Sequence, residues 1–364
     1  MIGIMKLVRP DILSLQPYQH AAWEPSFERM HANEMPWRAS DDSSTAGLNR
    51  YPEPQPDELI EHLAHLYGVA PANFLAGRGS DEGIDLLVRA FCRAGVDSVL
   101  ICPPTFGMYK VSARIQGAGV VEVPLLKQRD FALDASAVLA ACDKDPNIKL
   151  VFLCSPNNPT GNSLDRRDIE ALCQKLANRA VVVLDEAYIE FSGAESFAGQ
   201  LARYENLVVL RTLSKAYALA GARCGAVLAH ADIIDVLARV ITPYALPTHT
   251  VESVLKLTND AHAAEARQRI ETILKERERL TTQLSRLPSI TNVWRSDSNF
   301  LLAECVDADQ VLDAANAAGL IIRDPRANPA LARCVRISVG TPEQNERLLK
   351  GIAALPGRSA GDAA

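Results

Sequence analysis

Short apolar runs alternate with amphipathic stretches between residues 55 and 240. Amphipathic stretches such as DELIEHLAHLYGV (57–69) and DEGIDLLVRAFCRAG (81–95) carry apolar residues at helical spacing. Four other runs are apolar at consecutive positions, which is typical of strands buried on both faces. These runs are SVLICPP, KLVFLCSP, AVVVLDEAY and LVVLRTLSK. Their alternation with helices predicts an α/β fold, in which an open, mostly parallel sheet has helices on both sides.

The pattern changes near residue 248. Helix-forming residues continue without a proline to Pro288, which predicts one long helix or two in succession. The segments NFLLAEC, DADQVLDAANAAGL, IIRDP and CVRISVG then predict a strand, a helix and two further strands. We therefore expect an N-terminal segment, a large domain, a linking helix, a small C-terminal α/β domain and a disordered tail. Their predicted ranges are 1–50, 51–250, 251–287, 288–356 and 357–364.

Composition and charge exclude several classes of protein. The chain has 364 residues, of which 48% are hydrophobic, and a formal net charge of -6. Such a charge offers no basic face for nucleic acid or for an anionic membrane surface. The apolar runs are too short to span a bilayer, and the N-terminus MIGIMKLVRPDIL lacks the apolar core of a signal peptide. We expect a cytoplasmic protein.

Eight cysteines raise the alternatives of disulfides or a metal site. They form no CxxC pair and have no nearby histidine cluster. Several lie in apolar strand-like runs, as Cys102 and Cys154 do. The pattern favours buried, reduced thiols and predicts no metal site.

The predicted strands end in side chains that can do chemistry. Phe106 follows the first strand, Asn158 the second, Asp185 and Tyr188 the third, and the fourth ends on Lys215. In parallel sheets, ligands bind at the carboxyl ends of the strands. A surface lysine is the ordinary alternative for Lys215, but its apolar neighbours and the order of the four strand ends favour a site.

The motifs NNPTG, LDEAY and TLSKAYALAGARCG together resemble the fold-type-I aminotransferases, which depend on pyridoxal phosphate. Further segments are similar to the histidinol-phosphate aminotransferases in particular, and the resemblance covers the whole chain. These segments are RYPEPQPDELIEHLA, GRGSDEGIDLLVRAF, CPPTFGMY, CSPNNPTG, IIRD and RISVGT. The resemblance implies the fold-type-I architecture: a large domain with a mostly parallel central sheet and a smaller C-terminal α/β domain.

The resemblance implies roles for the residues at the strand ends, and their chemistry agrees. Lys215 would form an imine with the cofactor aldehyde, because lysine supplies an amine on a flexible stem. Asp185 would keep the ring nitrogen protonated, so that the ring can withdraw electrons. Asn158 and Tyr188 would donate hydrogen bonds to the phenolic oxygen. Phe106 would stack on the ring, where many relatives have tyrosine.

The cofactor phosphate needs an anion site. We expect Ser80 to cap a helix, with the backbone N–H groups of Asp81 and Glu82 free for the phosphate and their carboxylates turned away. Taken alone, this segment favours an ordinary helix start, but beside the lysine motif the phosphate site is favoured. Ser214 and Arg223 would complete the cradle, with Arg223 as a bidentate partner.

Tyr51 is implied by resemblance to reach the cofactor phosphate of a neighbouring subunit, which implies a homodimer with shared sites. Arg336 occupies the family's position for an arginine that binds the carboxylate of glutamate and the phosphate of the other substrate. Arg323 is a second candidate for that phosphate. Tyr18 would support Arg323, although it could equally be a core tyrosine. Asn33 and Glu34 in HANEMPW resemble the family's segment at the substrate-facing wall, from which Met35 and Trp37 depart.

The resemblance implies that glutamate and imidazole acetol phosphate are converted to 2-oxoglutarate and L-histidinol phosphate by ping-pong kinetics, with Lys215 as the general base. Two alternatives remain open at this point: an aminotransferase for aromatic amino acids, and a threonine-phosphate decarboxylase. A regulator that binds the cofactor is disfavoured, because we find no helix-turn-helix and no basic surface.

Overall fold

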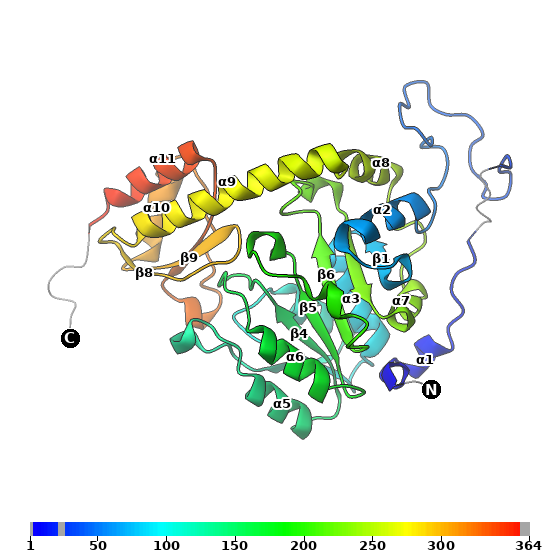
Figure 1. Cartoon of the computed structure of the whole chain (residues 1–364), viewed down its shortest axis with the longest axis horizontal. Coiled ribbons are helices and arrows are strands. Elements are labelled where there is room, and N and C mark those ends of the chain that lie inside the picture. The colour runs from blue at the N-terminus through cyan, green and yellow to red at the C-terminus, as the bar shows by residue number, and fades with distance from the viewer. Residues whose placement is uncertain (1–2, 21–25, 357–364) are drawn as a thin grey trace.

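Two β-sheets of different size organise the chain, and a long helix leads from one to the other (Figure 1). The structure is a computed structural model and describes residues 3–20 and 26–356. The disordered tail predicted at 357–364 lies outside the described residues. The larger sheet has seven strands in the order β1-β7-β6-β5-β4-β2-β3. Its strands are β1 (Phe74–Gly77), β2 (Ser98–Ile101), β3 (Gly119–Glu122), β4 (Ile148–Cys154), β5 (Val181–Asp185), β6 (Leu207–Thr212) and β7 (Gly225–Ala229).

The predicted parallel core of this sheet is confirmed. The four apolar runs form β2, β4, β5 and β6, and each pairs in parallel with its neighbour. Strands β1, β3 and β7 were not predicted, because each has only four or five residues and carries a glycine. Strand β7 runs antiparallel to both β1 and β6. Its first residues therefore lie at the edge of the sheet where β6 ends.

Helices cover both faces of the larger sheet, which explains the uninterrupted apolar runs. Val182 and Leu184 pack on one face in the same apolar cluster as α2 (Asp57–Tyr67), α5 (Ala135–Lys144) and α6 (Arg166–Lys175). Val181 and Val183 pack on the other face with α3 (Ser80–Phe91), α4 (Met108–Gln116) and α7 (Ala231–Ala238). Each such fully buried side chain contributes about 1.5–3 kcal/mol to folding.

The helical stretch after residue 248 forms two helices, one of the two predicted alternatives. Helix α8 (Thr248–Leu257) ends at Thr258, and α9 (Asp260–Leu284) begins after Asn259. The Asn259 side chain accepts a hydrogen bond from the backbone N–H of His262, which caps the new helix. Helix α9 runs from the side of the larger sheet to the smaller one (Figure 1).

The smaller sheet contains β8 (Ile290–Val293), β9 (Phe300–Cys305) and β10 (Cys334–Ser338), all antiparallel in the order β10-β9-β8. Helices α10 (Ala308–Ala317) and α11 (Pro342–Ala353) pack against it. The strand predicted for IIRDP is wrong: only an isolated bridge joins Arg323 to Arg336. Ile322 packs against the apolar cluster of the smaller sheet, but Ile321 is 95% exposed and Pro325 has no N–H to donate, so no continuous ladder forms here.

The N-terminal segment contains short helices, η1 (Gly3–Lys6) and α1 (Pro10–Leu13), and the described part of residues 14–56 is irregular. It extends over the outside of the molecule beside α2 and α8 (Figure 1). Other short 3₁₀ helices are η2 (Pro71–Asn73), η3 (Lys127–Arg129), η4 (Ile189–Phe191), η5 (Phe197–Gln200), η6 (Ala220–Ala222) and η7 (Pro329–Leu331). The predicted domain boundaries stay a prediction.

All eight cysteines are buried and none forms a disulfide. Burial raises the pKa of every one of these thiols. Within residues 3–20 and 26–356, no helix is both long and apolar enough to cross a membrane. In the same part of the chain, no group of three or more His, Cys, Asp or Glu side chains could hold a metal ion. The cytoplasmic location stays a prediction.

Candidate active site

A cavity of about 710 Å³ opens where the central parallel strands end, with the smaller sheet on its other side. This volume is typical of a small-molecule site. Eleven of the residues singled out from the sequence line it: Ser80, Asp81, Phe106, Asn158, Asp185, Tyr188, Ser214, Lys215, Arg223, Arg323 and Arg336. The remaining candidates, Glu82, Tyr51, Tyr18 and Asn33, do not line it.

Asp185 is the last residue of β5 and is buried, with 3% of its surface exposed. Its carboxylate accepts hydrogen bonds from the Tyr109 hydroxyl at 2.7 Å and from the backbone N–H of Ala187 at 3.1 Å. Burial raises the pKa of Asp185 to about 6, while the Tyr109 hydrogen bond acts in the opposite direction. Among the described residues, no ion pair neutralises Asp185, so a cationic group in the cavity would stabilise it.

Lys215 follows β6 by three residues and extends into the same cavity. Among the described residues, no hydrogen bond or ion pair holds its amine, which lies 5.6 Å from the centre of the Tyr188 ring. Partial burial lowers the pKa of Lys215, and the positive charges of Arg336 and Arg223 act in the same direction. A larger fraction of this amine is therefore neutral near pH 7 than in an exposed lysine.

The start of α3 and the start of β7 meet at one corner of the cavity, where a Cβ on Gly225 would lie 2.7 Å from the Gly79 backbone. The helix begins at Ser80, so Gly79, not Ser80, takes the N-cap position, with φ of 86°. A Cβ on Gly79 would lie 3.1 Å from the Arg223 guanidinium. Arg223 donates to the Ser214 hydroxyl at 3.5 Å. The cradle thus combines first-turn N–H groups, a hydroxyl and a guanidinium.

The two acidic residues of this helix behave differently. Glu82 turns away from the cavity, as expected, and accepts hydrogen bonds from the side chain of Arg78 at 2.6 Å and from its backbone N–H. Asp81 was also expected to turn away, and this is wrong: its carboxylate lies 3.6 Å from Arg223. A phosphate bound at this corner would compete with the Asp81 carboxylate for the Arg223 guanidinium.

Arg336 connects the smaller sheet to the loop after β4. Its guanidinium donates to the Asn158 side-chain oxygen at 2.5 Å and lies 5.1 Å from the centre of the Phe300 ring. Because the oxygen of Asn158 accepts this bond, the NH₂ group of the same amide is left to donate into the cavity. Arg336 Nε is buried and has no hydrogen-bond partner in the described chain. Backbone hydrogen bonds in both directions tie Arg336 to Arg323.

Three N-terminal candidates lie away from this cavity. Tyr18 is 65% exposed and contacts His20 edge to face, so it is not a core residue. Asn33 is not among the lining residues and has φ of 56°. Tyr51 lines a second cavity, between the N-terminal segment and helices α2 and α8, and stacks on Tyr244 with ring centres 4.6 Å apart.

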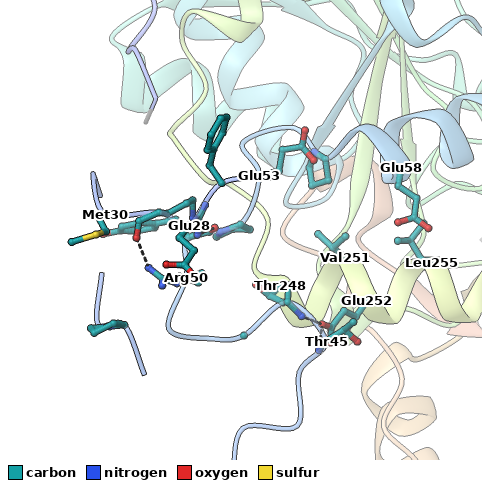
Figure 2. A pocket seen from close by; sticks show the side chains of 18 residues that line it. Glu28, Met30, Thr45, Arg50, Glu53, Glu58, Thr248, Val251, Glu252 and Leu255 are labelled. Carbon is teal, nitrogen blue, oxygen red and sulfur yellow. Dashed lines mark hydrogen bonds between the residues drawn. The ribbon is translucent and has the colours of Figure 1, made fainter. Parts of the chain in front are cut away.

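The second cavity is bounded by the N-terminal segment on one side and by α8 on the other (Figure 2). Figure 2 shows Thr45 against Glu252, whose carboxylate accepts the Thr45 backbone N–H at 2.7 Å. Deeper in the segment, the buried Glu34 carboxylate accepts the Tyr51 backbone N–H at 2.7 Å and pairs with Arg29 and Arg50. The segment is thus held by its own buried ion pairs.

One residue at the site has no role in the sequence-based hypothesis. Tyr109 lies in α4, three residues after Phe106, and is fully buried against Phe152 with ring centres 4.8 Å apart. Its hydroxyl is the side-chain donor to Asp185. Phe106 lies just before α4, and its ring meets the Tyr109 ring edge to face with centres 5.6 Å apart, but only the structure shows that Tyr109 meets the end of β5.

Comparisons with known proteins agree with this geometry. The family model for aminotransferase class I and II matches residues 26–352. The chain is 49% identical over 365 residues to the histidinol-phosphate aminotransferase of Xylella fastidiosa (strain 9a5c), covering 97% of this chain and 98% of that protein. It is 46% identical over 354 residues to that of Stenotrophomonas maltophilia (strain R551-3), covering 96% and 97%.

Solved structures give the same result. The crystal structure of histidinol-phosphate aminotransferase from Sinorhizobium meliloti in complex with pyridoxal-5'-phosphate matches with a TM-score of 0.75 and 26% identity, over 84% of this chain and 82% of that one. The chain therefore belongs to the aminotransferase class I and II family, and within it to the histidinol-phosphate aminotransferases.

Proposed function

We propose that this chain binds pyridoxal phosphate and transfers the amino group of glutamate to imidazole acetol phosphate, giving L-histidinol phosphate and 2-oxoglutarate. One observation carries this proposal: Lys215, Asp185 and the Arg223 cradle line a single cavity in a chain that is 49% identical to a histidinol-phosphate aminotransferase. The family is shown by the comparisons, and the roles of the individual residues are our proposal.

The cavity fits the cofactor in three respects. A buried carboxylate without an ion-pair partner, Asp185, suits a protonated ring nitrogen. The corner at Gly79, Ser214 and Arg223 suits a phosphate, and a side chain at Gly79 would press against Arg223. An amine without partners among the described residues, Lys215, suits a covalent bond to an aldehyde.

The bound cofactor supplies an aldehyde for attachment of amino groups and a ring that withdraws electrons from the attached carbon. Lys215, whose pKa is lowered, would serve as the general base that accepts and returns the Cα proton of the substrate. Asp185 would keep the cofactor's ring nitrogen protonated. The Asn158 NH₂ group, oriented by Arg336, and the Tyr188 hydroxyl would donate hydrogen bonds to the cofactor's phenolic oxygen, and Phe106 would cover its ring.

The substrates are anions, and the cavity carries the charges to bind them. Four cationic and three acidic side chains line it, namely Lys215, Arg223, Arg323, Arg336, Asp81, Asp185 and Asp324. Arg336 is our candidate for the carboxylate of glutamate and, in the second half-reaction, for the substrate phosphate. Arg323 is adjacent through paired backbone hydrogen bonds, so it can contribute a second guanidinium to the phosphate.

We also propose a homodimer in which Tyr51 of one subunit reaches the cofactor phosphate of the other. Tyr51 is half exposed and does not line the cofactor cavity of its own subunit. Its backbone is fixed by two hydrogen bonds, because its N–H donates to Glu34 and its carbonyl accepts from Arg29. The same segment exposes large apolar side chains, which is typical of a surface that is covered in an assembly. These are Phe27, Met30, Met35 and Trp37.

A half-reaction assay tests the substrate. The pyridoxamine form of the purified protein is offered imidazole acetol phosphate, phenylpyruvate or 2-oxoglutarate, and the return of the aldehyde absorbance is followed. We expect rapid return with imidazole acetol phosphate and with 2-oxoglutarate. Return with phenylpyruvate but not with imidazole acetol phosphate would replace the proposal by the aromatic alternative. Release of CO₂ from threonine phosphate by the aldehyde form would identify the decarboxylase.

Mixed dimers test the shared site. Lys215→Ala and Tyr51→Phe are prepared separately, then unfolded and refolded together. If Tyr51 acts across the interface, the mixed dimer contains one site with neither substitution and regains activity that neither parent has. If Tyr51 acted within its own subunit, every site in the mixture would carry one substitution and activity would not return.

A further inference from the structure

A buried arginine lies behind the active site, on the opposite face of the sheet from the cofactor cavity. Arg211 is in β6, four residues before Lys215, and its side chain is 7% exposed. Side chains alternate along a strand, so Arg211 points away from the cavity that Thr212 lines. A cation at a strand position with apolar neighbours on both sides costs stability unless its partners compensate for burial.

Two carboxylates surround this guanidinium, and both come from the turn that follows Asp185. Arg211 donates to Glu190 Oε1 at 2.7 Å and lies 3.7 Å from Glu186 Oε2. Glu186 directly follows Asp185, and its carboxylate also accepts the backbone N–H of Phe197 at 2.8 Å. The side chains of Glu186 and Glu190 are 1% and 12% exposed. Both charges are thus held inside the protein.

Further contacts complete the cluster. Arg211 donates to the Ser196 hydroxyl at 3.2 Å, and its guanidinium lies 4.5 Å from the centre of the Tyr67 ring in α2. Arg211 is the only hydrogen-bond partner of the Glu190 carboxylate in the described chain, because Glu190 Oε2 has none. Loss of the guanidinium would therefore leave a buried carboxylate without a partner.

The cluster spans the two turns that carry the chemistry. Glu186 and Glu190 flank Tyr188 in the turn after β5, whereas Arg211 precedes the turn with Lys215. The backbone also joins these turns, because the Glu186 N–H donates to the Leu210 carbonyl at 3.0 Å. Tyr217 lies two residues after Lys215. Burial, together with the nearby Glu190 charge, raises the pKa of Tyr217 to about 12.

We propose that Arg211 is a positioning residue, which holds the turn after Asp185 against the turn that carries Lys215. It touches neither cofactor nor substrate in this arrangement. Its effect is transmitted through Glu186 and Glu190, which flank Tyr188 and follow Asp185. The Asp185 carboxylate and the Lys215 amine thereby keep their separation. This role rests on the proposed pyridoxal-phosphate site.

The experiment uses the full chain loaded with pyridoxal phosphate. Arg211→Met removes the guanidinium, and Arg211→Lys keeps the charge but cannot bridge Glu190 and Ser196 together. Arg93→Met is the matched control: Arg93 also holds a buried carboxylate, that of Asp97, with two hydrogen bonds at 2.7 and 3.0 Å. Asp97 precedes β2, at the edge of the sheet away from the cavity.

Three quantities are measured for each protein: the dissociation constant of the cofactor, the pH midpoint of its visible absorbance, and the thermal unfolding midpoint without cofactor. For Arg211→Met we expect weaker cofactor binding by about tenfold and an absorbance midpoint moved by about half a pH unit or more. Arg211→Lys should show the same changes at smaller size. Arg93→Met should lower only the thermal midpoint.

The role is overturned if both Arg211 variants lose thermal stability, as the control does, but keep the wild-type dissociation constant and absorbance midpoint. If Arg211→Met does not fold, Arg211→Lys decides by the same criteria, because it leaves no carboxylate without a cation. Should the wild-type protein gain no visible absorbance with pyridoxal phosphate, the proposed function itself fails, which is a distinct outcome.

Discussion

Replacing Tyr109 by phenylalanine isolates the hydrogen bond that the phenol donates to Asp185. The substitution removes one oxygen and keeps the ring, so the stack on Phe152 and the edge contact with Phe106 remain. The lost bond measures 2.7 Å and is fully buried. A hydrogen bond to a charged group contributes about 1.5–3 kcal/mol and one to a neutral group about 0.5–1.5 kcal/mol.

The difference between these two values sets the expected change in pKa. It is about 1–1.5 kcal/mol, and a change of about 1.4 kcal/mol corresponds to one pH unit. The pKa of Asp185 is already raised by burial to about 6, and the Tyr109 bond opposes that rise. Removal of the bond should therefore raise this pKa by about one further pH unit. Near pH 7, Asp185 would change from mostly ionised to substantially protonated.

Stability of the cofactor-free protein gives a direct assay. Because the pKa of Asp185 is higher in the folded protein than its ordinary value of 3.8, this group favours folding below that value and loses its contribution as pH rises through about 6. In Tyr109→Phe the pKa of Asp185 is higher, so the stability that Asp185 contributes is lost over a higher range of pH. Urea unfolding should show Tyr109→Phe less stable than wild type by about 0.5–1.5 kcal/mol at pH 5 and by about 1.5–3 kcal/mol at pH 8.5.

A matched control is available in Tyr67→Phe. Tyr67 is buried, but its hydroxyl has no hydrogen-bond partner in the described chain, so its removal should leave the free energy of unfolding within about 0.5 kcal/mol of wild type. In the loaded enzyme, the acidic limb of the pH–kcat profile should move up by about one pH unit for Tyr109→Phe only. A stability difference independent of pH, with an unmoved profile, would refute the reasoning.

Three further substitutions test the proposed roles. Lys215→Ala should abolish turnover and covalent trapping of the cofactor by borohydride; trapping at another lysine would show that the wrong amine was chosen. Asp185→Asn should bind cofactor but lower kcat by about 10³-fold or more, and a near-normal rate would rule out its role at the ring nitrogen. Arg336→Lys should raise KM for glutamate and for imidazole acetol phosphate by about tenfold each through loss of the bidentate contact, whereas a change in only one KM would assign Arg336 to that substrate alone.

Much of the fold and of the candidate site could be predicted from local sequence. Continuous apolar runs identified β2, β4, β5 and β6, because burial on both faces removes polar positions. Their ends carry Asn158, Asp185 and Lys215, and parallel pairing brings such ends together. Strand β1 offered only three apolar residues, Phe74 to Ala76, before Gly77 and Arg78, which is too short a run to indicate a strand.

Other features depend on contacts between distant segments, which no local pattern encodes. The isolated bridge at Arg323 forms opposite β10 without a strand of its own. The helix dipole predicts only that an acidic residue is favourable at the N-terminus of α3. It does not predict that the Asp81 side chain turns towards Arg223. The Tyr109 bond to Asp185 and the Arg336 bond to Asn158 join residues 76 and 178 positions apart. These pairings arise only once the sheets are packed.

The eight buried thiols give this chain a built-in set of reporters. A thiol that is shielded from solvent and has a raised pKa reacts with alkylating reagents only when its surroundings open. Cys154 and Cys224 pack in the clusters of the larger sheet, whereas Cys305 on β9 packs in the apolar cluster of the smaller sheet. The order in which native protein incorporates a mass label should therefore record which sheet opens first, without any engineered probe.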